Sequence, residues 1–252
     1  MNAADALTAA NVAYGQGDYA GAIRALRRVL SADIGYFEED AARHVAAFPA
    51  SDHSRFWSAP KDFYPDGAGL QSIFDFIYAR RVWGGGSGAG SDLKHTVLYV
   101  AYVQALMDCC DIRSVLDLGC GDWRFSRYLD FSKRTYLGLD IVPSVIATNR
   151  GAFATPNVSF EQADISAHTR YGDYDLILCK DVLQHLSNAR VSEILAGCRS
   201  ARFALITNDY HPANMDCRDG ETRPLDITAP PFDLAARPVL SFGGKVAFLA
   251  EK

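Results

Sequence analysis

The sequence lacks several features that assign a chain to a functional class at sight. Basic residues are not in excess: 25 Lys and Arg stand against 30 Asp and Glu, for a formal net charge of −5. A domain-wide basic surface for a phosphate backbone is therefore not expected, and we predict no nucleic-acid partner. No run of 18 apolar residues occurs, so no membrane-spanning segment is predicted.

Disulfide, zinc and export signals are also missing. The six cysteines form no C-x-x-C pair, and no set of Cys and His has zinc-site spacing. The first 19 residues have neither the basic nor the apolar region of a secretory signal. We therefore expect a cytoplasmic protein whose thiols are reduced.

The composition is that of a globular protein. The 252 residues, 49% of them hydrophobic, allow one full domain and an appendage. Apolar spacing predicts two short helices over residues 4–31 and a third over residues 35–47. The first two resemble one tetratricopeptide unit, and because no second copy follows they form at most a lone hairpin.

A polar stretch over residues 50–69, which includes Pro65 and Asp66, is rich in turn-forming residues and marks a domain boundary. We predict an N-terminal helical segment, residues 1–60, and a main domain, residues 61–252. The N-terminal helices are either a cap on the main domain or a surface for homodimerisation or protein docking, and both interpretations stay open.

A glycine-rich loop lies between two predicted helices. An amphipathic helix over residues 70–82 precedes it, and a long helix capped by Asp92 follows it to about residue 107. The loop, residues 83–91, is either a flexible linker or a ligand loop. We favour a ligand loop because Trp83, Ser87 and Ser91 interrupt the glycines and because a helix N-terminus attracts a carboxylate.

From Ser114 onward, short apolar runs alternate with helical segments. The predicted strands are residues 114–119, 135–140, 158–162, 174–179 and 202–207, followed by a hairpin of residues 239–242 and 245–251. The predicted helices are residues 123–129, a helix beginning at Pro143, and residues 182–198. This alternation predicts a doubly wound α/β fold with a mostly parallel sheet covered on both faces.

Three acids end three successive predicted strands. In open α/β sheets, ligands bind at the carboxyl ends of the strands. Asp117 leads into a turn with Gly119 and Gly121, but the third glycine of the dinucleotide fingerprint is missing, which weakens a nicotinamide oxidoreductase reading. Asp140 suits a ribose diol and Asp164 an adenine amine, so the pattern predicts an adenosine slot without a pyrophosphate cradle.

The segments VLDLGCGDW, YLGLDIV, FEQADI and YDLILCKDVLQHLS resemble the class I S-adenosylmethionine-dependent methyltransferases. The resemblance covers about residues 70–252 and implies a seven-stranded Rossmann-like fold and S-adenosylmethionine as cofactor. Cofactor contacts implied by the resemblance are Asp117, Gly119, Cys120, Gly121, Asp140, Ile141, Asp164 and Ile165. Trp123 stands where the family pattern has glycine, so its indole must point away from the cofactor or form a wall of the pocket.

The segments IFDFIYARRVWGGGSGAGSD and RPLDITAPPFDL are similar to a subgroup of bacterial stand-alone methyltransferases associated with surface-polysaccharide or other small-molecule biosynthesis. This resemblance implies that the loop of residues 83–91 closes over the carboxylate end of the cofactor.

Two residues after the fourth strand are candidates for a general base. Asp181 and His185 are four apart in a predicted helix and would share one face, so the acid would orient the imidazole. The alternative is that Asp181 caps the helix and His185 is a core histidine. Lys180 faces either the cofactor, a substrate anion or solvent.

The loop after the fifth strand supplies candidates for acceptor binding. Tyr210 and His211 are predicted to contact the acceptor, and Arg223 either grips an anionic substrate or forms a surface salt bridge. A divalent metal would require Asp181, His185, Asp209 and His211 to converge, and we predict no metal.

The sequence therefore predicts O-methylation of a small or sugar-like, possibly anionic, acceptor. Within the enzyme class the alternative is N-methylation of a small-molecule amine, which needs a base less. Outside it, the alternative is a non-catalytic cofactor-binding scaffold that docks a partner through the N-terminal hairpin.

Overall fold

The structure is a computed structural model that describes residues 2–64, 67–168 and 170–252. Pro65 and Asp66 of the predicted boundary lie outside the described residues. Among the described residues, no helix combines the length and the apolar character needed to cross a membrane.

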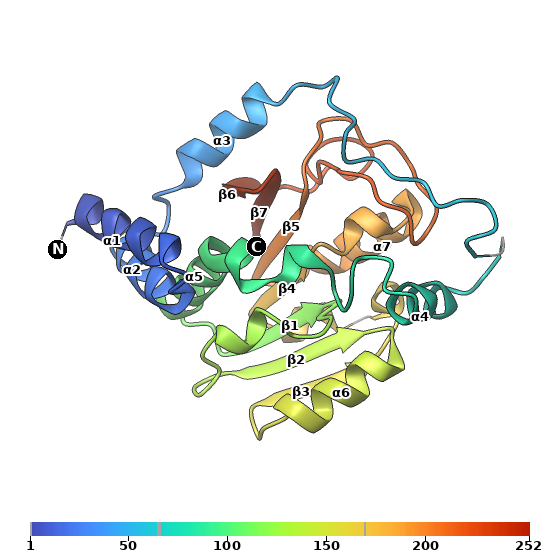
Figure 1. The fold of residues 1–252 in the computed structure, drawn as a ribbon, viewed down its shortest axis with the longest axis horizontal. Helices are drawn as coiled ribbons and strands as arrows, with labels where there is room; N and C mark the ends of the chain where they lie inside the picture. Colours follow the sequence, from blue (N-terminus) through green and yellow to red (C-terminus); the bar gives the residue numbers. More distant parts are fainter. Residues whose placement is uncertain (1, 65–66, 169) are drawn as a thin grey trace.

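A seven-stranded sheet forms the middle of the molecule, in the order β3-β2-β1-β4-β5-β7-β6 (Figure 1). Strands β1 to β5 are parallel, and β7 is inserted antiparallel between β5 and β6. The strands are β1 (Ser114–Leu118), β2 (Thr135–Asp140), β3 (Val158–Gln162), β4 (Leu176–Lys180), β5 (Phe203–Asp209), β6 (Arg237–Phe242) and β7 (Lys245–Glu251). The predicted mostly parallel sheet with a final hairpin is confirmed.

Helices cover both faces of this sheet because its central strands are buried on both sides. In β1, Val115 packs into one core cluster with residues of the helices α2 (Tyr19–Ala32) and α5 (Leu93–Cys109). Leu116 and Leu118 pack into the other with α4 (Leu70–Ala79) and α7 (Asn188–Cys198). The fold is therefore doubly wound, as predicted.

The N-terminal helices are α1 (Ala3–Gly15), α2 and α3 (Glu38–Ala47). The strongly amphipathic α2 directs Ile23, Leu26 and Leu30 into the same core cluster as α5, so its apolar face is covered within the chain (Figure 1). Arg237 of β6 forms an ion pair with Glu38 of α3 at 3.1 Å. The hairpin thus packs directly against the main domain.

Two predicted helices are wrong in part. Residues 123–129 contain only a short 3₁₀ turn, Ser126–Tyr128, and residues 182–198 begin with another, Leu183–His185, before α7. The backbone of Trp123 has φ of +53° and that of Asp181 has φ of +59°, a left-handed conformation that an α-helix cannot contain. Helix α6 (Pro143–Phe153) begins at its proline, as predicted.

The indole of Trp123 points away from the strand-end edge of the sheet and into the core. It is 7% exposed and packs against the rings of Phe131, Tyr136, Phe153 and Phe160. The backbone accepts a conformation that favours glycine because the side chain is fixed by this aromatic cluster. Trp123 therefore replaces the expected glycine while its indole packs in the core and stays out of the turn after β1.

Candidate active site

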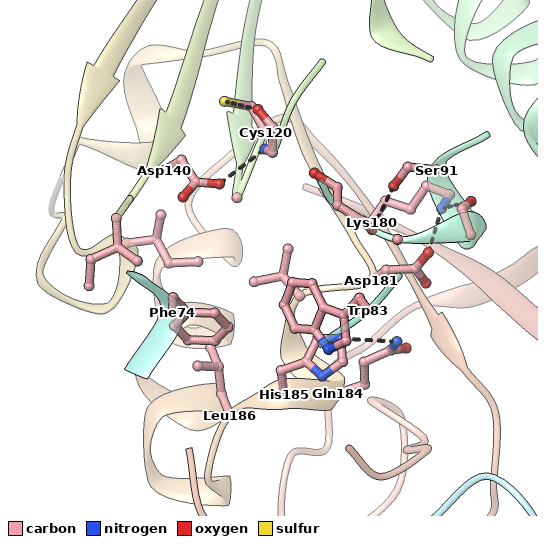
Figure 2. Close-up of a pocket in the computed structure, with 18 of the residues that line it drawn as sticks. Phe74, Trp83, Ser91, Cys120, Asp140, Lys180, Asp181, Gln184, His185 and Leu186 are labelled. Carbon is pink, nitrogen blue, oxygen red and sulfur yellow. Dashed lines mark hydrogen bonds and ion pairs between the residues drawn. The ribbon is translucent and has the colours of Figure 1, made fainter. Parts of the chain in front are cut away.

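A cavity of about 360 Å³ lies at the carboxyl ends of the parallel strands, under the glycine-rich loop (Figure 2). We call it the strand-end cavity. Most predicted site residues line it: Trp83, Ser87, Ser91, Asp117, Gly119, Cys120, Gly121, Asp140, Ile141, Ile165, Lys180, Asp181 and His185. Sequence reasoning missed further lining residues, among them Phe74, Tyr78, Gln184, Leu186, Thr222 and Lys245.

The turn after β1 needs glycine for two reasons. Gly119 and Gly121 have φ of +70° and +54°, in the left-handed region. A Cβ on Gly119 would also lie 2.5 Å from a methyl carbon of Val182, and a Cβ on Gly121 would lie 2.2 Å from Ser87 Oγ. The glycine-rich loop can therefore approach the turn closely.

That close approach is fixed by hydrogen bonds of Ser87. The backbone N–H of Asp122 donates to Ser87 Oγ at 2.8 Å, and Ser87 Oγ lies 2.8 Å from the hydroxyl of Tyr78. Ser91 Oγ donates to the carbonyl of Ser87 at 3.2 Å. The loop is docked onto the turn after β1 rather than extended as a linker.

Asp140 ends β2 with its carboxylate in the wall of the cavity. Oδ2 accepts from the N–H of Gly121 and Oδ1 from the N–H of Val142, both at 3.0 Å. Burial nevertheless raises the pKa of Asp140 to about 6. The carboxylate is thus oriented by the backbone and poorly solvated, which favours a ligand that donates hydrogen bonds to it.

Asp117 lies deeper, at the end of β1. Its Oδ2 accepts from the hydroxyl of Tyr136 at 2.6 Å. Burial raises the pKa of Asp117 to about 6, and the nearby charge of Asp140 adds to the effect. Two poorly solvated carboxylates therefore share one wall.

Asp164 is the predicted contact for the adenine amine. It is not among the residues that line the cavity, and its Oδ1 accepts from the N–H and the hydroxyl of Ser166 at 2.9 and 2.6 Å. Its neighbours Ala163 and Ile165 line the cavity instead. The carboxylate turns away because it caps the short helix that begins at Ile165.

Asp181, one of the two predicted base candidates, is enclosed by lysines. Its Oδ2 pairs with Lys180, and its Oδ1 accepts from Lys245 Nζ at 2.7 Å. Burial alone would raise the pKa of Asp181, but the two ammonium groups outweigh burial and lower it to about 2. A carboxylate with both oxygens occupied and so low a pKa is a weak proton acceptor.

The ionic cluster extends away from the cavity. Lys245 Nζ also donates to Asp209 Oδ1 at 2.9 Å, and Arg55 donates to the same oxygen at 2.8 Å. On the other side, Lys180 Nζ donates to the carbonyl of Gly90 at 3.2 Å. The charges of β4, β5 and β7 are thus linked to the glycine-rich loop and to the N-terminal segment.

His185 does not pair with Asp181, because the predicted helix is absent there. Its Nδ1 lies 3.0 Å from the carbonyl oxygen of Glu221. The hydroxyl of Thr222 also lies 3.0 Å from Nδ1. Because the carbonyl can only accept, we assign the proton to Nδ1, so that Nε2 accepts from the amide N–H of Gln184 at 3.4 Å. Burial lowers the pKa of His185 to about 4, so the ring is neutral at pH 7.

The imidazole of His185 is covered by Trp83. The two ring centroids are 4.7 Å apart, with 31° between the ring planes (Figure 2). In the described part of the chain, the buried indole N–H of Trp83 has no hydrogen-bond partner. An unpaired buried donor in a cavity wall is a natural contact for a ligand oxygen.

The predicted acceptor residues lie outside the cavity. Tyr210 donates to Asp226 at 3.2 Å, and His211 is fully buried with Nε2 3.1 Å from the carbonyl of Ala50. Arg223 is 1% exposed, and its guanidinium donates to backbone carbonyls, including Leu183 at 2.8 Å. These three side chains hold loops together, which corrects the expectation that they contact a substrate.

The side chains considered for a metal do not gather at one point. Among the described residues, no group of three or more His, Cys, Asp or Glu side chains has the arrangement of a metal site. Asp181 and Asp209 converge only on the ammonium group of Lys245.

Comparisons with known proteins agree with this architecture. Residues 115–201 match the protein family described as "Methyltransferase domain". No curated protein matches the sequence.

Solved structures provide the remaining matches. Magnesium protoporphyrin IX methyltransferase from Synechocystis with bound S-adenosylmethionine is 18% identical, with a TM-score of 0.52 over 75% of this chain and 99% of that chain. The 1,6-didemethyltoxoflavin-N1-methyltransferase from Burkholderia thailandensis is also 18% identical, with a TM-score of 0.53 over 77% of this chain and 91% of that chain. At such identities the likeness shows the fold.

Other matches cover less of their own length. This chain spans 65% of the methyltransferase domain of bacterial CtHen1, at 19% identity, with a TM-score of 0.40 over 44% of this chain. It spans 47% of another methyltransferase structure. The family match at residues 115–201 runs from β1 to just beyond α7, so this part of the sheet is similar to a methyltransferase domain.

Proposed function

We propose that the strand-end cavity binds S-adenosylmethionine and that Asp140 holds the hydroxyls of its ribose. The observation that carries this proposal is the carboxylate of Asp140, fixed by the N–H groups of Gly121 and Val142 and buried in the cavity wall. Two hydroxyl donors facing one preoriented carboxylate would replace the solvation that burial removed.

The rest of the cavity suits the other parts of this cofactor. Ile141, Ala163 and Ile165 line the side next to Asp140 with apolar groups, which suit an adenine ring. Gly119, Cys120 and Gly121 line the cavity, and we assign the methionine portion to this stretch of backbone.

The docked loop supplies the end of the cavity that we assign to the methionine carboxylate. Ser87 and Ser91 line this end of the cavity. The ammonium group of Lys180 lies beside it and donates a hydrogen bond to the carbonyl of Gly90. Burial destabilises the ammonium form of Lys180 and so lowers its pKa. A carboxylate ligand nearby would stabilise this ammonium group, which an uncharged ligand would not do.

When bound, S-adenosylmethionine supplies a methyl group on a sulfonium, and the protein's contribution is to position the acceptor and manage its proton. The unpaired N–H of Trp83 and the imidazole of His185, whose Nε2 has only the long contact with the Gln184 amide at 3.4 Å, lie in the same part of the cavity. We assign Trp83 to acceptor positioning and to water exclusion. We assign His185 Nε2 as the group that takes a proton from a hydroxyl acceptor.

We propose O-methylation of a small acceptor. The lowered pKa of His185 makes it a weak base, which favours an acidic hydroxyl, such as that of a phenol, over the alcohol of a sugar-like acceptor. The same observation favours a second candidate, N-methylation of a small-molecule amine, because a neutral amine attacks without a base.

Isothermal titration calorimetry tests the cofactor assignment. We expect S-adenosylmethionine and S-adenosylhomocysteine to bind the wild-type chain and NAD not to bind. Asp140→Asn keeps the shape but removes the charge, and should weaken both complexes at least tenfold. Glu193→Gln, an equivalent change at an exposed position of α7, serves as the control and should leave both affinities unchanged. Equal affinities in Asp140→Asn and Glu193→Gln would overturn the assignment.

A further inference from the structure

A second cavity, of about 720 Å³, lies between the N-terminal hairpin and the main domain. We call it the hairpin cavity. Residues of α1, α2, α5 and the turn between β6 and β7 line it, together with Phe37, Arg55, the end of the glycine-rich loop at Ala89 and Gly90, and Asp209 at the end of β5. Its volume is within the range of small-molecule pockets.

The lining has two parts of different chemistry. Leu7, Val97, Leu98 and Phe242 provide apolar surface that suits the body of a ligand. The charged part has three cations, Arg55, Lys94 and Lys245, against the single carboxylate of Asp209.

The charges on this lining are not equally neutralised. Arg55 and Lys245 both pair with Asp209, and Asp92, at the start of α5, pairs with Arg124. Across the part of the chain that the structure describes, neither Lys94 nor His95 has an ion-pair partner. Both side chains are exposed, so the positive charge of Lys94 lies at the rim of the cavity, where it is free to meet a ligand that enters from solvent.

The position of Lys94 and His95 makes this arrangement unfavourable for the helix itself. They lie in the first turn of α5, which contains no acidic residue. The positive end of the helix dipole lies there and favours acids over bases. Their presence is explained more readily by an anion that they both contact than by helix stability.

The hairpin cavity adjoins the strand-end cavity. Ala89, Gly90 and Lys245 line both, so a ligand in one cavity approaches the other across the glycine-rich loop and the ammonium group of Lys245. A ligand here would therefore border the end of the strand-end cavity at which the ionic cluster lies.

We propose that the hairpin cavity binds a small organic anion with an apolar body, whose charged group contacts Lys94 and His95. Such a ligand is either the methyl acceptor or an effector of the methyltransferase, and the chemistry of recognition is the same. The binding site itself does not depend on the cofactor assignment.

Titration calorimetry with 3-hydroxy-2-naphthoate and the uncharged 2-naphthol at pH 7 tests the site. We expect the naphthoate to bind the wild-type chain and Lys94→Glu to weaken it at least fivefold, with 2-naphthol affected less than twofold. His95→Ala should weaken the naphthoate in the same direction. The control is Lys133→Glu, the same charge reversal at an exposed residue that lines neither cavity. Equal naphthoate affinity in the two charge-reversal variants would refute the proposal, as would 2-naphthol binding as tightly as the naphthoate.

The same ligand distinguishes the two roles. Formation of S-adenosylhomocysteine from S-adenosylmethionine and the naphthoate, lost in Lys94→Glu, identifies an acceptor site, whereas Lys94-dependent binding without turnover identifies an effector site. Asp140→Asn should keep the affinity for the naphthoate. If the cofactor fails to bind the wild-type chain while the naphthoate binds through Lys94, the proposed function fails and this site stands.

Discussion

The indole of Trp83 covers the imidazole of His185, with ring centroids 4.7 Å apart, although the two residues lie more than 100 positions apart in the chain. The glycine-rich loop thereby places an aromatic ring over the neutral imidazole of His185 in the wall of the strand-end cavity. In the proposed function, the pair would combine a proton acceptor with a barrier to water, an arrangement that suits methyl transfer to a hydroxyl.

The first prediction concerns His185 itself. His185→Asn should lower kcat with a hydroxyl acceptor by about 10²- to 10⁴-fold, the usual contribution of a general base. The affinity for S-adenosylhomocysteine should change less than twofold. The measurement is S-adenosylhomocysteine release with a panel of phenol, sugar and amine acceptors, together with calorimetry.

Trp83→Phe is the matched variant, because it keeps an aromatic ring next to His185 while it removes the indole N–H together with the five-membered ring. It should raise KM for the acceptor more than it lowers kcat. A kcat for His185→Asn within threefold of wild type on every hydroxyl acceptor contradicts the base assignment, and turnover of amines alone, unchanged in this variant, points to N-methylation.

A second prediction concerns pH and Asp140. Its pKa of about 6 in the ligand-free chain means that the carboxyl is protonated below pH 6. A cofactor that donates hydrogen bonds to the carboxylate must then displace that proton, so the Kd for S-adenosylhomocysteine should rise as pH falls, by up to about tenfold per unit below pH 6. Calorimetry between pH 5 and 8 measures the slope.

Asp117 titrates in the same range and lines the same cavity, so it contributes to that slope. Asp140→Asn should flatten the pH dependence in part, and the Asp140→Asn/Asp117→Asn double variant should abolish it. A slope that survives in the double variant excludes both carboxylates as its source.

Much of the fold could be predicted from the sequence because its signals are local. Each buried strand is a short apolar run, and Asp140 can be placed at the end of β2 because the run stops there. The parallel arrangement then brings the strand ends to one edge without any long-range information.

The catalytic geometry could not be predicted in the same way. The spacing of Asp181 and His185 suggests a helix, but Asp181 adopts φ of +59° and is neutralised by Lys245, 64 residues later. The sequence around Arg223 is that of a surface loop, yet its guanidinium is buried and donates hydrogen bonds to the carbonyls of Leu183 and Leu186. Contacts between distant segments decide these roles, and no periodicity encodes them.

A third prediction concerns stability rather than binding. Burial raises the pKa of Asp117 from its ordinary value to about 6, so ionisation disfavours the folded state. A rise of about two pKa units corresponds to a destabilisation of about 3 kcal/mol. This destabilisation is fully present above pH 6, where the carboxyl is ionised in both states, and it is absent below about pH 4. Asp117→Asn should therefore stabilise the ligand-free chain by about 1–3 kcal/mol at pH 8 and by less at pH 5, as measured by urea unfolding.

Glu193→Gln, on the exposed face of α7, should leave the free energy of unfolding within about 0.5 kcal/mol of wild type at both pH values. An effect of Asp117→Asn that is the same at pH 8 and pH 5 would show that lost hydrogen bonds, and not ionisation, dominate.

The fourth prediction distinguishes an ion-pair role of Asp181 from a role as base. Asn tolerates the left-handed backbone of this position, so Asp181→Asn removes the charge without added strain. Lys180, whose side chain is 2% exposed, would then lose its only carboxylate partner among the described residues, whereas Lys245 would keep Asp209. Breaking one partner of a buried pair costs about 3–5 kcal/mol, so urea unfolding should show a loss of this size.

The double variant Lys180→Met/Asp181→Asn tests whether the unpaired ammonium group of Lys180 causes the loss of stability. If an unpaired ammonium group is responsible for the loss, removing it should restore at least about 1 kcal/mol, because apolar replacements of buried pairs are often neutral or stabilising. Asp40→Asn, which breaks the exposed pair with Arg43, should change the free energy of unfolding by less than about 0.5 kcal/mol. A fully stable Asp181→Asn that has lost turnover would instead restore Asp181 as the base, since only a chemical role would then remain for its carboxylate.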